Sequence, residues 1–210
     1  MSPYAFIRPF VLSVLATAAF AAHAGDGRIP TDQDKLPKGV VAAPAVAAQC
    51  MACHGPGGQS QYDDWPALAG QKQSYLLQQL QDFKSGARKD PMMAPVVVNL
   101  SDADMKKLAE HFSKQPPLQP RQPLAANVAA PAAAAACMAC HDNAALPSEP
   151  FLHGQKAAYL TEQIKAFRDG KRKNAVMEAM TKPLSDADIT AIAEHFSRLA
   201  PVAPVAAAKK

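Results

Sequence analysis

The chain has 210 residues, of which 19% are charged and 6% aromatic. Nineteen prolines and ten glycines are too few for a collagen or a wholly disordered chain, and four cysteines exclude a disulfide-dense scaffold. The formal net charge of +4 comes without a dense lysine- and arginine-rich tract, which argues against a nucleic-acid-binding surface. The length allows one domain or two small domains of about 100 residues each.

Residues 1–24 have the pattern of a secretory signal peptide. Arg8 supplies a positive charge, the 13 residues from Phe10 to Ala22 are apolar or small, and a small-x-small cleavage site ends at Ala24. We therefore expect cleavage after Ala24 and export to an oxidising compartment. The alternative is an uncleaved membrane anchor, but a helix that spans a bilayer needs about 20 apolar residues.

The rest of the chain contains two copies of one unit. The sequence Cys-Met-Ala-Cys-His occurs at residues 50–54 and again, letter for letter, at residues 137–141. Farther along, residues 66–113 match residues 150–197 at 23 of 48 positions, and the second copy is three residues shorter in the loop after its histidine. This repetition predicts two homologous domains, which we assign to residues 25–114 and 124–200.

Proline marks the segment between the two copies. Four of the nine residues in 115–123 are proline, a composition that favours an extended, semi-rigid linker. The alanine- and proline-rich residues 201–210 are expected to form a flexible tail.

Each copy has the pattern of an all-α unit. Residues 71–86 carry apolar side chains at helical spacing and end at a glycine. A last helix begins after Ser101, with Asp104 three residues on in a variant of the capping box, and Ser185 and Asp188 repeat this pattern. An alanine-rich stretch before each cysteine pair predicts a short helix. No alternating β-branched run occurs, so we expect no sheet.

Cys-x-x-Cys-His is the attachment pattern of c-type haem. Two thiols about one helical turn apart can form thioethers with the two vinyl groups of one haem, and the adjacent histidine then lies beneath the iron. The alternatives are a disulfide, a redox-active thiol pair or a zinc site that joins all four cysteines. Two such motifs within a duplicated unit favour haem, attached through Cys50 and Cys53 in the first copy and through Cys137 and Cys140 in the second.

The sixth ligand of each iron is methionine, histidine or none. Met93 and Met177 are the methionines that align between the copies, so we expect them to bind iron opposite His54 and His141. Core packing is the ordinary role of a methionine. Ligation by His and Met raises the reduction potential relative to two histidines and leaves no open position on the iron.

Other residues near the motifs have more than one interpretation. Pro66 and Pro150 either present their carbonyl groups to the free N–H of the haem histidines or form simple turns. His153 is either a ligand or a local hydrogen-bonding group. His111 and His195, near helix C-termini, are expected at the surface.

A basic cluster follows the long helix of the second copy. We interpret it as a solvated face, with a docking patch for an acidic redox partner as the alternative. Its residues are Arg168, Lys171, Arg172 and Lys173, with a weaker echo in Lys84, Arg88 and Lys89.

The chain resembles the di-haem cytochromes c4, which are tandem class I cytochrome c domains. The haem motifs, residues 66–71, the helix that begins near Tyr75 and the position of each methionine eight residues before its serine cap carry the resemblance. It implies ligation by His54 and Met93 and by His141 and Met177. The chain differs from the family at Asp142, where glycine is usual, and at His153, where a small residue is usual.

The resemblance implies single-electron transport in the bacterial periplasm, from the cytochrome bc1 complex or a periplasmic dehydrogenase towards a terminal oxidase such as the cbb3 type. Two haem c groups are the expected cofactors, peripheral membrane association is possible, and no nucleic-acid partner is expected. The alternative is a haem-bearing enzyme or enzyme subunit, of the peroxidase or thiosulfate-oxidising type, with an open axial site on the second haem. The shorter second loop makes that haem the one to test.

Overall fold

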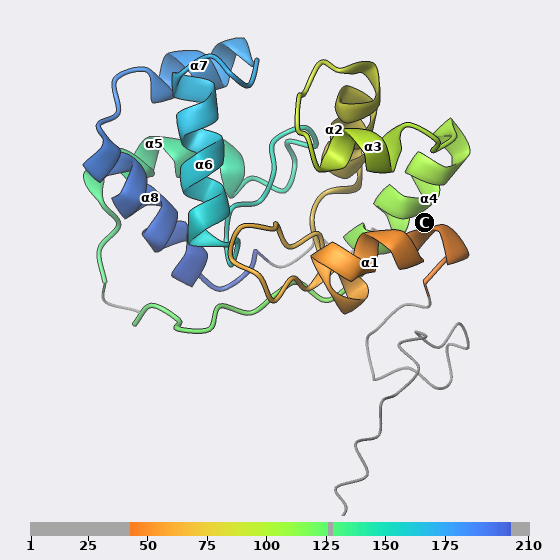
Figure 1. Cartoon of the computed structure of the whole chain (residues 1–210). Coiled ribbons are helices and arrows are strands. Elements are labelled where there is room, and N and C mark those ends of the chain that lie inside the picture. The colour runs from red at the N-terminus through yellow and green to blue at the C-terminus, as the bar shows by residue number, and fades with distance from the viewer. Residues whose placement is uncertain (1–42, 126–127, 203–210) are drawn as a thin grey trace, which may run out of the picture.

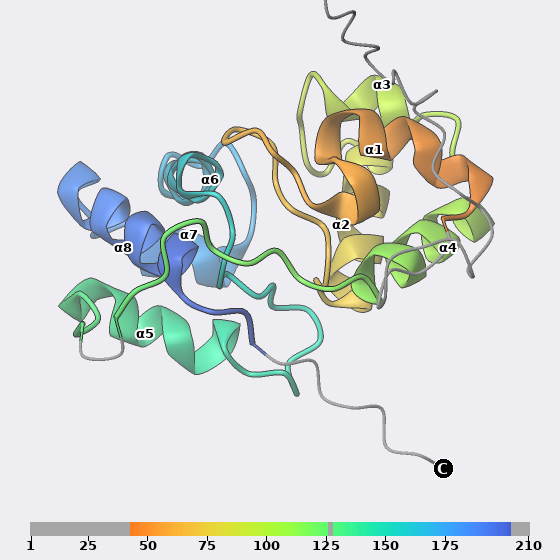
Figure 2. The ribbon, with the colours of Figure 1, turned by 90° about the horizontal axis from the view of Figure 1, so that it is seen from below.

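The computed structural model describes residues 43–125 and 128–202, so the predicted signal peptide and most of the predicted tail lie outside the described residues. Within those ranges the chain is helical and has no strand, as predicted. The helices form two groups that lie side by side (Figures 1 and 2). The first group is η2 (Ala45–Ala47), α1 (Ala48–His54), η3 (Pro56–Gly58), α2 (Gln73–Ser85), α3 (Met93–Val97) and α4 (Asp102–Ser113), and the second is α5 (Ala132–His141), α6 (Ala157–Arg168), α7 (Ala175–Thr181) and α8 (Asp186–Arg198).

The helix ends follow the local sequence. Helix α2 begins two residues later than predicted because Lys72 is extended, with φ −60° and ψ 129°. It ends at Gly86, whose φ of 78° lies in the left-handed region that glycine adopts without strain. Ser101 accepts a hydrogen bond from the Asp104 N–H at 3.1 Å, and the Asp104 carboxylate accepts from the Ser101 N–H at 3.2 Å. The predicted capping box is therefore confirmed, and α8 repeats it.

Each group has its own apolar core, built where α2 packs on α4 and where α6 packs on α8. The predicted apolar faces of α4 and α8 are buried in these cores: Met105, Leu108, Ala109 and Phe112 in the first, and Ile189, Ile192, Ala193 and Phe196 in the second. Two separate cores agree with the duplication seen in the sequence, because each copy buries its own helix faces.

The two groups meet through a reciprocal pair of glutamines. Gln71 donates to the Phe151 carbonyl and accepts from the Phe151 N–H, both at 2.9 Å. Gln155, the equivalent of Gln71, makes the same two bonds with Ala67, the equivalent of Phe151, also at 2.9 Å. The contact thus has the pattern of a two-fold interface, in which residue i meets j and j meets i.

The segment after α4 contains no helix up to Ala125 and contacts both groups. The Pro116 carbonyl of this segment accepts a hydrogen bond from Gln59 of the first group. The Gln122 carbonyl accepts one from Arg198 of the second group. Gly70, with φ of 70°, lies so close to Pro117 that an added Cβ would come within 2.6 Å of its Cβ. The proline-rich segment is therefore packed along the molecule at several points.

Candidate functional site

All eight predicted site residues line one cavity of about 1120 Å³. Its walls come from both helical groups and are mostly apolar, with Leu76, Phe83 and Phe112 on one side and Leu160, Ile164 and Phe196 on the other. The two sets of candidate ligands therefore lie in the two halves of a single continuous space. The residues concerned are Cys50, Cys53, His54 and Met93, and Cys137, Cys140, His141 and Met177.

The cysteine-histidine motifs lie at the C-terminal ends of α1 and α5. Nδ1 of His54 lies 2.9 Å from the Pro66 carbonyl oxygen, and Nδ1 of His141 lies 2.7 Å from that of Pro150. Because a carbonyl only accepts, each Nδ1 carries the proton and each Nε2 keeps a lone pair for a metal. The predicted role of the two prolines is confirmed.

Burial keeps both histidines in the form that can bind a metal. It lowers the pKa of His54 from its ordinary value, while the Pro66 hydrogen bond and nearby Asp90 act in the opposite direction. Burial also lowers the pKa of His141, and here the bond to the Pro150 carbonyl opposes burial while the Lys72 ammonium acts with it. The two rings are thus similar in solvation but have different charges beside them.

The thiols do not support the alternative interpretations of the motifs. All four cysteines are free, so neither pair forms a disulfide. Burial raises the pKa of the Cys50 thiol to about 11 and also raises that of Cys137, whereas reactive cysteines have lowered values. Within the described part of the chain, no group of three or more His, Cys, Asp or Glu side chains is placed to hold a metal ion, which argues against a shared zinc site.

Met93 and Met177 belong to the short helices α3 and α7. In the first group the Asp90 carboxylate accepts from the N–H groups of Met92 and Met93, both at 2.9 Å. In the second the side-chain oxygen of Asn174, the equivalent of Asp90, accepts from the Met177 N–H at 3.0 Å. The same turn is therefore fixed by a charged residue in one copy and by a neutral one in the other.

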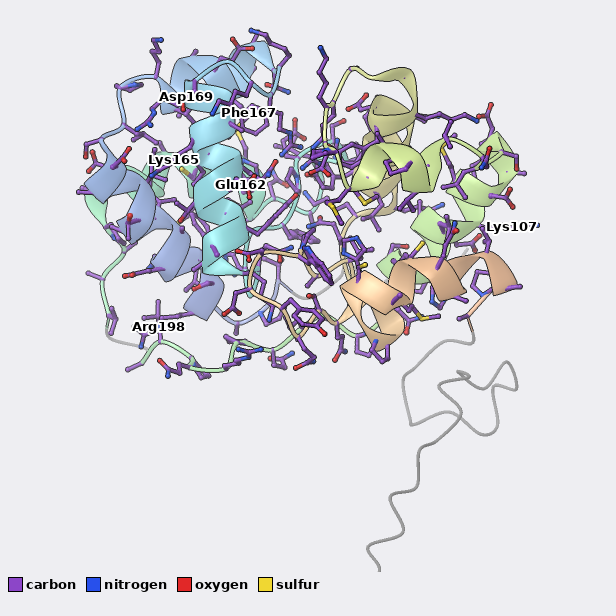
Figure 3. All side chains as sticks on the ribbon, in the orientation of Figure 1. Lys107, Glu162, Lys165, Phe167, Asp169 and Arg198 are labelled. Atoms are coloured by element: carbon purple, nitrogen blue, oxygen red, sulfur yellow. The ribbon has the colours of Figure 1, made fainter. Side chains whose placement is uncertain are left out.

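Two arginines that sequence reasoning placed on a solvated face lie in the domain interface instead. Arg172 donates to the Tyr75 hydroxyl at 3.2 Å and to Gln79 at 2.7 Å, both in the first group. It also donates to Gln163 at 2.8 Å, and its guanidinium lies over the Phe167 ring, 4.5 Å from the centroid. Figure 3 labels Phe167 on α6. The guanidinium is thus held by side chains of both domains.

Arg88, the equivalent of Arg172, makes the equivalent contacts from the first group. It donates to the Tyr159 hydroxyl at 3.0 Å, to Gln163 at 2.7 Å and to Gln79 at 2.8 Å. Each arginine, tyrosine and glutamine of this network has its equivalent in the other copy at the same alignment position. The identity of these polar residues in the two copies is the sequence feature that could have revealed the network between the domains.

The remaining basic residues of the cluster are largely paired within the second group. Arg168 donates to Asp186 at 2.6 Å and to Asp169 at 3.0 Å. Lys173 lies 3.7 Å from Glu178. These contacts agree with the interpretation of a solvated face and add ion pairs within it.

The cavity fits haem. Two thiols and a histidine with a free Nε2 lie together in each half, an aligned methionine lines the same half, and apolar side chains surround them. Arg88 and Arg172 also line the cavity, and the groups they bond to are neutral. Asp90 acts on Arg88 as a partial counter-charge, and the propionates of two haems would supply further negative charge to both arginines.

The other histidines among the described residues, His111, His153 and His195, lie outside the lining of this cavity. His153 Nε2 lies 2.7 Å from the Asp142 carboxylate, and its Nδ1 lies 2.8 Å from the Ala200 carbonyl, so it is a local hydrogen-bonding group. The prediction that His111 and His195 lie at the surface was wrong, since they are only 5% and 7% exposed. Burial lowers the pKa of His195.

Both halves of the chain match known families. Residues 41–115 match the cytochrome c family, and residues 125–196 match the family described as cytochrome c oxidase, cbb3-type, subunit III. Among the described residues no helix is long and apolar enough to cross a membrane.

Several known proteins align with about three quarters of this chain and with most of their own length. The chain is 35% identical to a cytochrome c4 of Pseudomonas aeruginosa over 182 residues, which cover 75% of this chain and 87% of that protein. It is 34% identical to a thiosulfate dehydrogenase electron acceptor of Thiomonas intermedia, with 77% and 83% covered. The crystal structure of reduced cytochrome c4 from Pseudomonas stutzeri superimposes with a TM-score of 0.62 at 32% identity, covering 73% of this chain and 94% of that one.

Proposed function

Because the chain belongs to the cytochrome c4 family of electron-transfer proteins with two haem c groups, we propose that it carries single electrons between redox proteins of the bacterial periplasm. In this proposal His54 and Met93 bind the first iron, and His141 and Met177 bind the second. Cys50 and Cys53 attach the first haem, and Cys137 and Cys140 the second. The bound haems would supply one-electron chemistry through the ferric and ferrous states of their irons.

The observation that carries the proposal is the single cavity shared by both sets of ligands. It would bring two redox centres close together, so that an electron could enter at one domain and leave from the other. The chain's own residues hold the ligands: Pro66 and Pro150 fix the histidine rings, and Asp90 and Asn174 fix the turns that bear the methionines. With a histidine and a methionine committed to each haem, neither haem would offer a site for substrate.

Two classes of electron donor have support. The family resemblance favours the cytochrome bc1 complex, with a terminal oxidase such as the cbb3 type as acceptor. The similarity to proteins named thiosulfate dehydrogenase electron acceptor favours a periplasmic dehydrogenase as donor. Export through the signal peptide of residues 1–24, with cleavage after Ala24, would place the protein beside either donor, in solution or peripherally on the membrane.

Optical spectroscopy of the holoprotein tests the ligand assignment. The weak far-red band of the ferric form, which marks methionine sulfur on haem iron, is expected at a strength that accounts for two haems. Carbon monoxide should not bind to the reduced protein. Half that strength, together with carbon monoxide binding, would contradict the proposal and favour an enzyme with an open second haem.

Reduction kinetics separate the donors. The purified holoprotein is mixed with reduced bc1 complex in one experiment and with a thiosulfate dehydrogenase plus thiosulfate in the other. The physiological donor should reduce it at a rate that falls with ionic strength, as expected for steered association. Slow, salt-independent reduction by both would count against either assignment.

A further inference from the structure

The loop that follows the second haem histidine is held from the other domain. Lys72, in the first group, donates from Nζ to the carbonyl oxygens of Asn143 and Leu146, each at 2.7 Å. Its ammonium also lies over the ring of Phe151, 4.4 Å from the centroid. Two carbonyls and an aromatic face thus surround the charge, and the Glu149 carboxylate is near enough to act on it, an arrangement that suits a fixed ammonium group.

A neighbouring side chain holds the same loop. Ser74 donates to the Pro147 carbonyl at 2.5 Å, so the first domain binds three carbonyl groups of the loop, those of residues 143, 146 and 147. Gln71 holds Phe151 at the far end of the loop, directly after the proline whose carbonyl fixes His141. The three-residue deletion in this loop therefore coincides with support from the other domain.

The equivalent lysine has different surroundings. Lys156 lies near Arg121 and Asp63, whose charges act on it with opposite signs. The loop of the first domain is held instead by the proline-rich segment, through Gln59 and Arg121. The loop after the haem histidine is thus bound by a lysine of the other domain in the second domain, and by the proline-rich segment in the first.

We propose that Lys72 is a positioning residue for the second haem, which holds residues 143–147 in place and fixes a positive charge beside the second iron. This inference rests on the proposed function, because it concerns the iron held by His141. A positive charge disfavours the ferric state, which carries one more positive charge than the ferrous state. Lys72 therefore raises the reduction potential of the second haem and leaves that of the first nearly unchanged.

Potentiometric titration of the holoprotein tests the proposal. The two one-electron steps are followed by the haem-methyl resonances in NMR, assigned to each domain with a Met177→His variant that displaces one set. Lys72→Met is expected to lower the potential of the second haem and to increase hydrogen exchange at Ala145 and Leu146. Lys72→Arg should retain most of the wild-type potential, and the matched variant Lys156→Met should leave the second haem unchanged.

Three results would overturn the proposal. They are unchanged potentials in Lys72→Met, an equal shift of both haems, or a shift in Lys72→Arg as large as that in Lys72→Met. Failure of the proposed function is seen separately, because it appears in the wild-type protein as a missing methionine band or as carbon monoxide binding. The hydrogen-exchange comparison is interpretable in either case.

Discussion

Asp90 and Asn174 occupy equivalent positions in the two domains and perform the same structural task with different charge. Each side-chain oxygen accepts from the backbone of the turn that bears the candidate methionine ligand. Asp90 also acts on His54, whose pKa its negative charge raises against the larger effect of burial. The two haem sites therefore differ in local charge although the fold repeats.

Exchanging these two residues should shift the two potentials in opposite directions. Asp90→Asn removes a negative charge and is expected to raise the potential of the first haem, while Asn174→Asp should lower that of the second. A partly solvated charge contributes less than about 1 kcal/mol, so each shift should be on the order of a few tens of millivolts. Potentiometry of both single variants and the double exchange checks this. A shift of the wrong haem would contradict it.

Local features of the fold were predictable from the sequence because neighbouring residues determine them. Ser101 and Asp104 form their capping box within one turn, and Gly86 ends its helix through its own backbone freedom. The hydrogen bonds accepted by the Pro66 and Pro150 carbonyls were also predictable, because each proline lies between the haem motif and the first long helix of its copy.

Contacts between the domains were not predictable in the same way. Arg172 belongs to a run of basic residues after the end of α6, and such a composition does not distinguish a surface that meets water from one that meets another domain. Arg172 was therefore expected in solvent and lies against Tyr75. His195 was missed for a related reason, since a histidine at a helix end is ordinarily exposed and here lies beside Phe196.

Replacing either of the reciprocal glutamines should lower the free energy of unfolding of the protein. Gln71→Ala leaves the half-buried N–H of Phe151 without its acceptor, and Gln155→Ala does the same to the buried N–H of Ala67. We expect each to lower the free energy of unfolding by about 1–3 kcal/mol, measured by denaturant titration of the holoprotein. Gln78→Ala is the matched control, because Gln78 is exposed and bonds to Asp82 in its own helix. Equal stability of Gln71→Ala and Gln78→Ala would refute the role of the interface.

Two glycines separate backbone strain from crowding. Gly86→Ala places a side chain at φ 78° in open space, so it should cost only the strain of about 1–2 kcal/mol. Gly70→Ala has a similar φ of 70° but also brings its Cβ against Pro117. We expect a larger loss of stability and greater protease sensitivity near residues 115–123. If the two variants melt at the same temperature, the proline-rich segment does not pack there as tightly as the distances indicate.

The capping boxes should make the protein sensitive to acid. Hydrogen bonds from Ser101 and Ser185 hold the pKa of Asp104 and that of Asp188 below their usual value. A carboxylate whose pKa is lowered by folding stabilises the folded state above its unfolded pKa of about 3.9. That stability is lost as the pH falls through the folded pKa.

Thermal unfolding followed between about pH 5 and pH 2 measures this effect. The double variant Asp104→Asn and Asp188→Asn should lose less stability over that range than the wild-type protein. Asp102→Asn, an exposed position in the same first turn, is the control. An equally steep loss in the double variant would assign the acid sensitivity to other carboxylates.

The reciprocal glutamines also have a consequence for complementation. Gln71 bonds to Phe151, and Phe151 follows the proline that orients His141, while Gln155 stands in the same relation to Ala67 and His54. Each half of the molecule thus completes the histidine support of the other half. Two fragments produced by cutting the chain between the domains would each keep a haem motif and a core, but only their reassociation would restore both histidine settings.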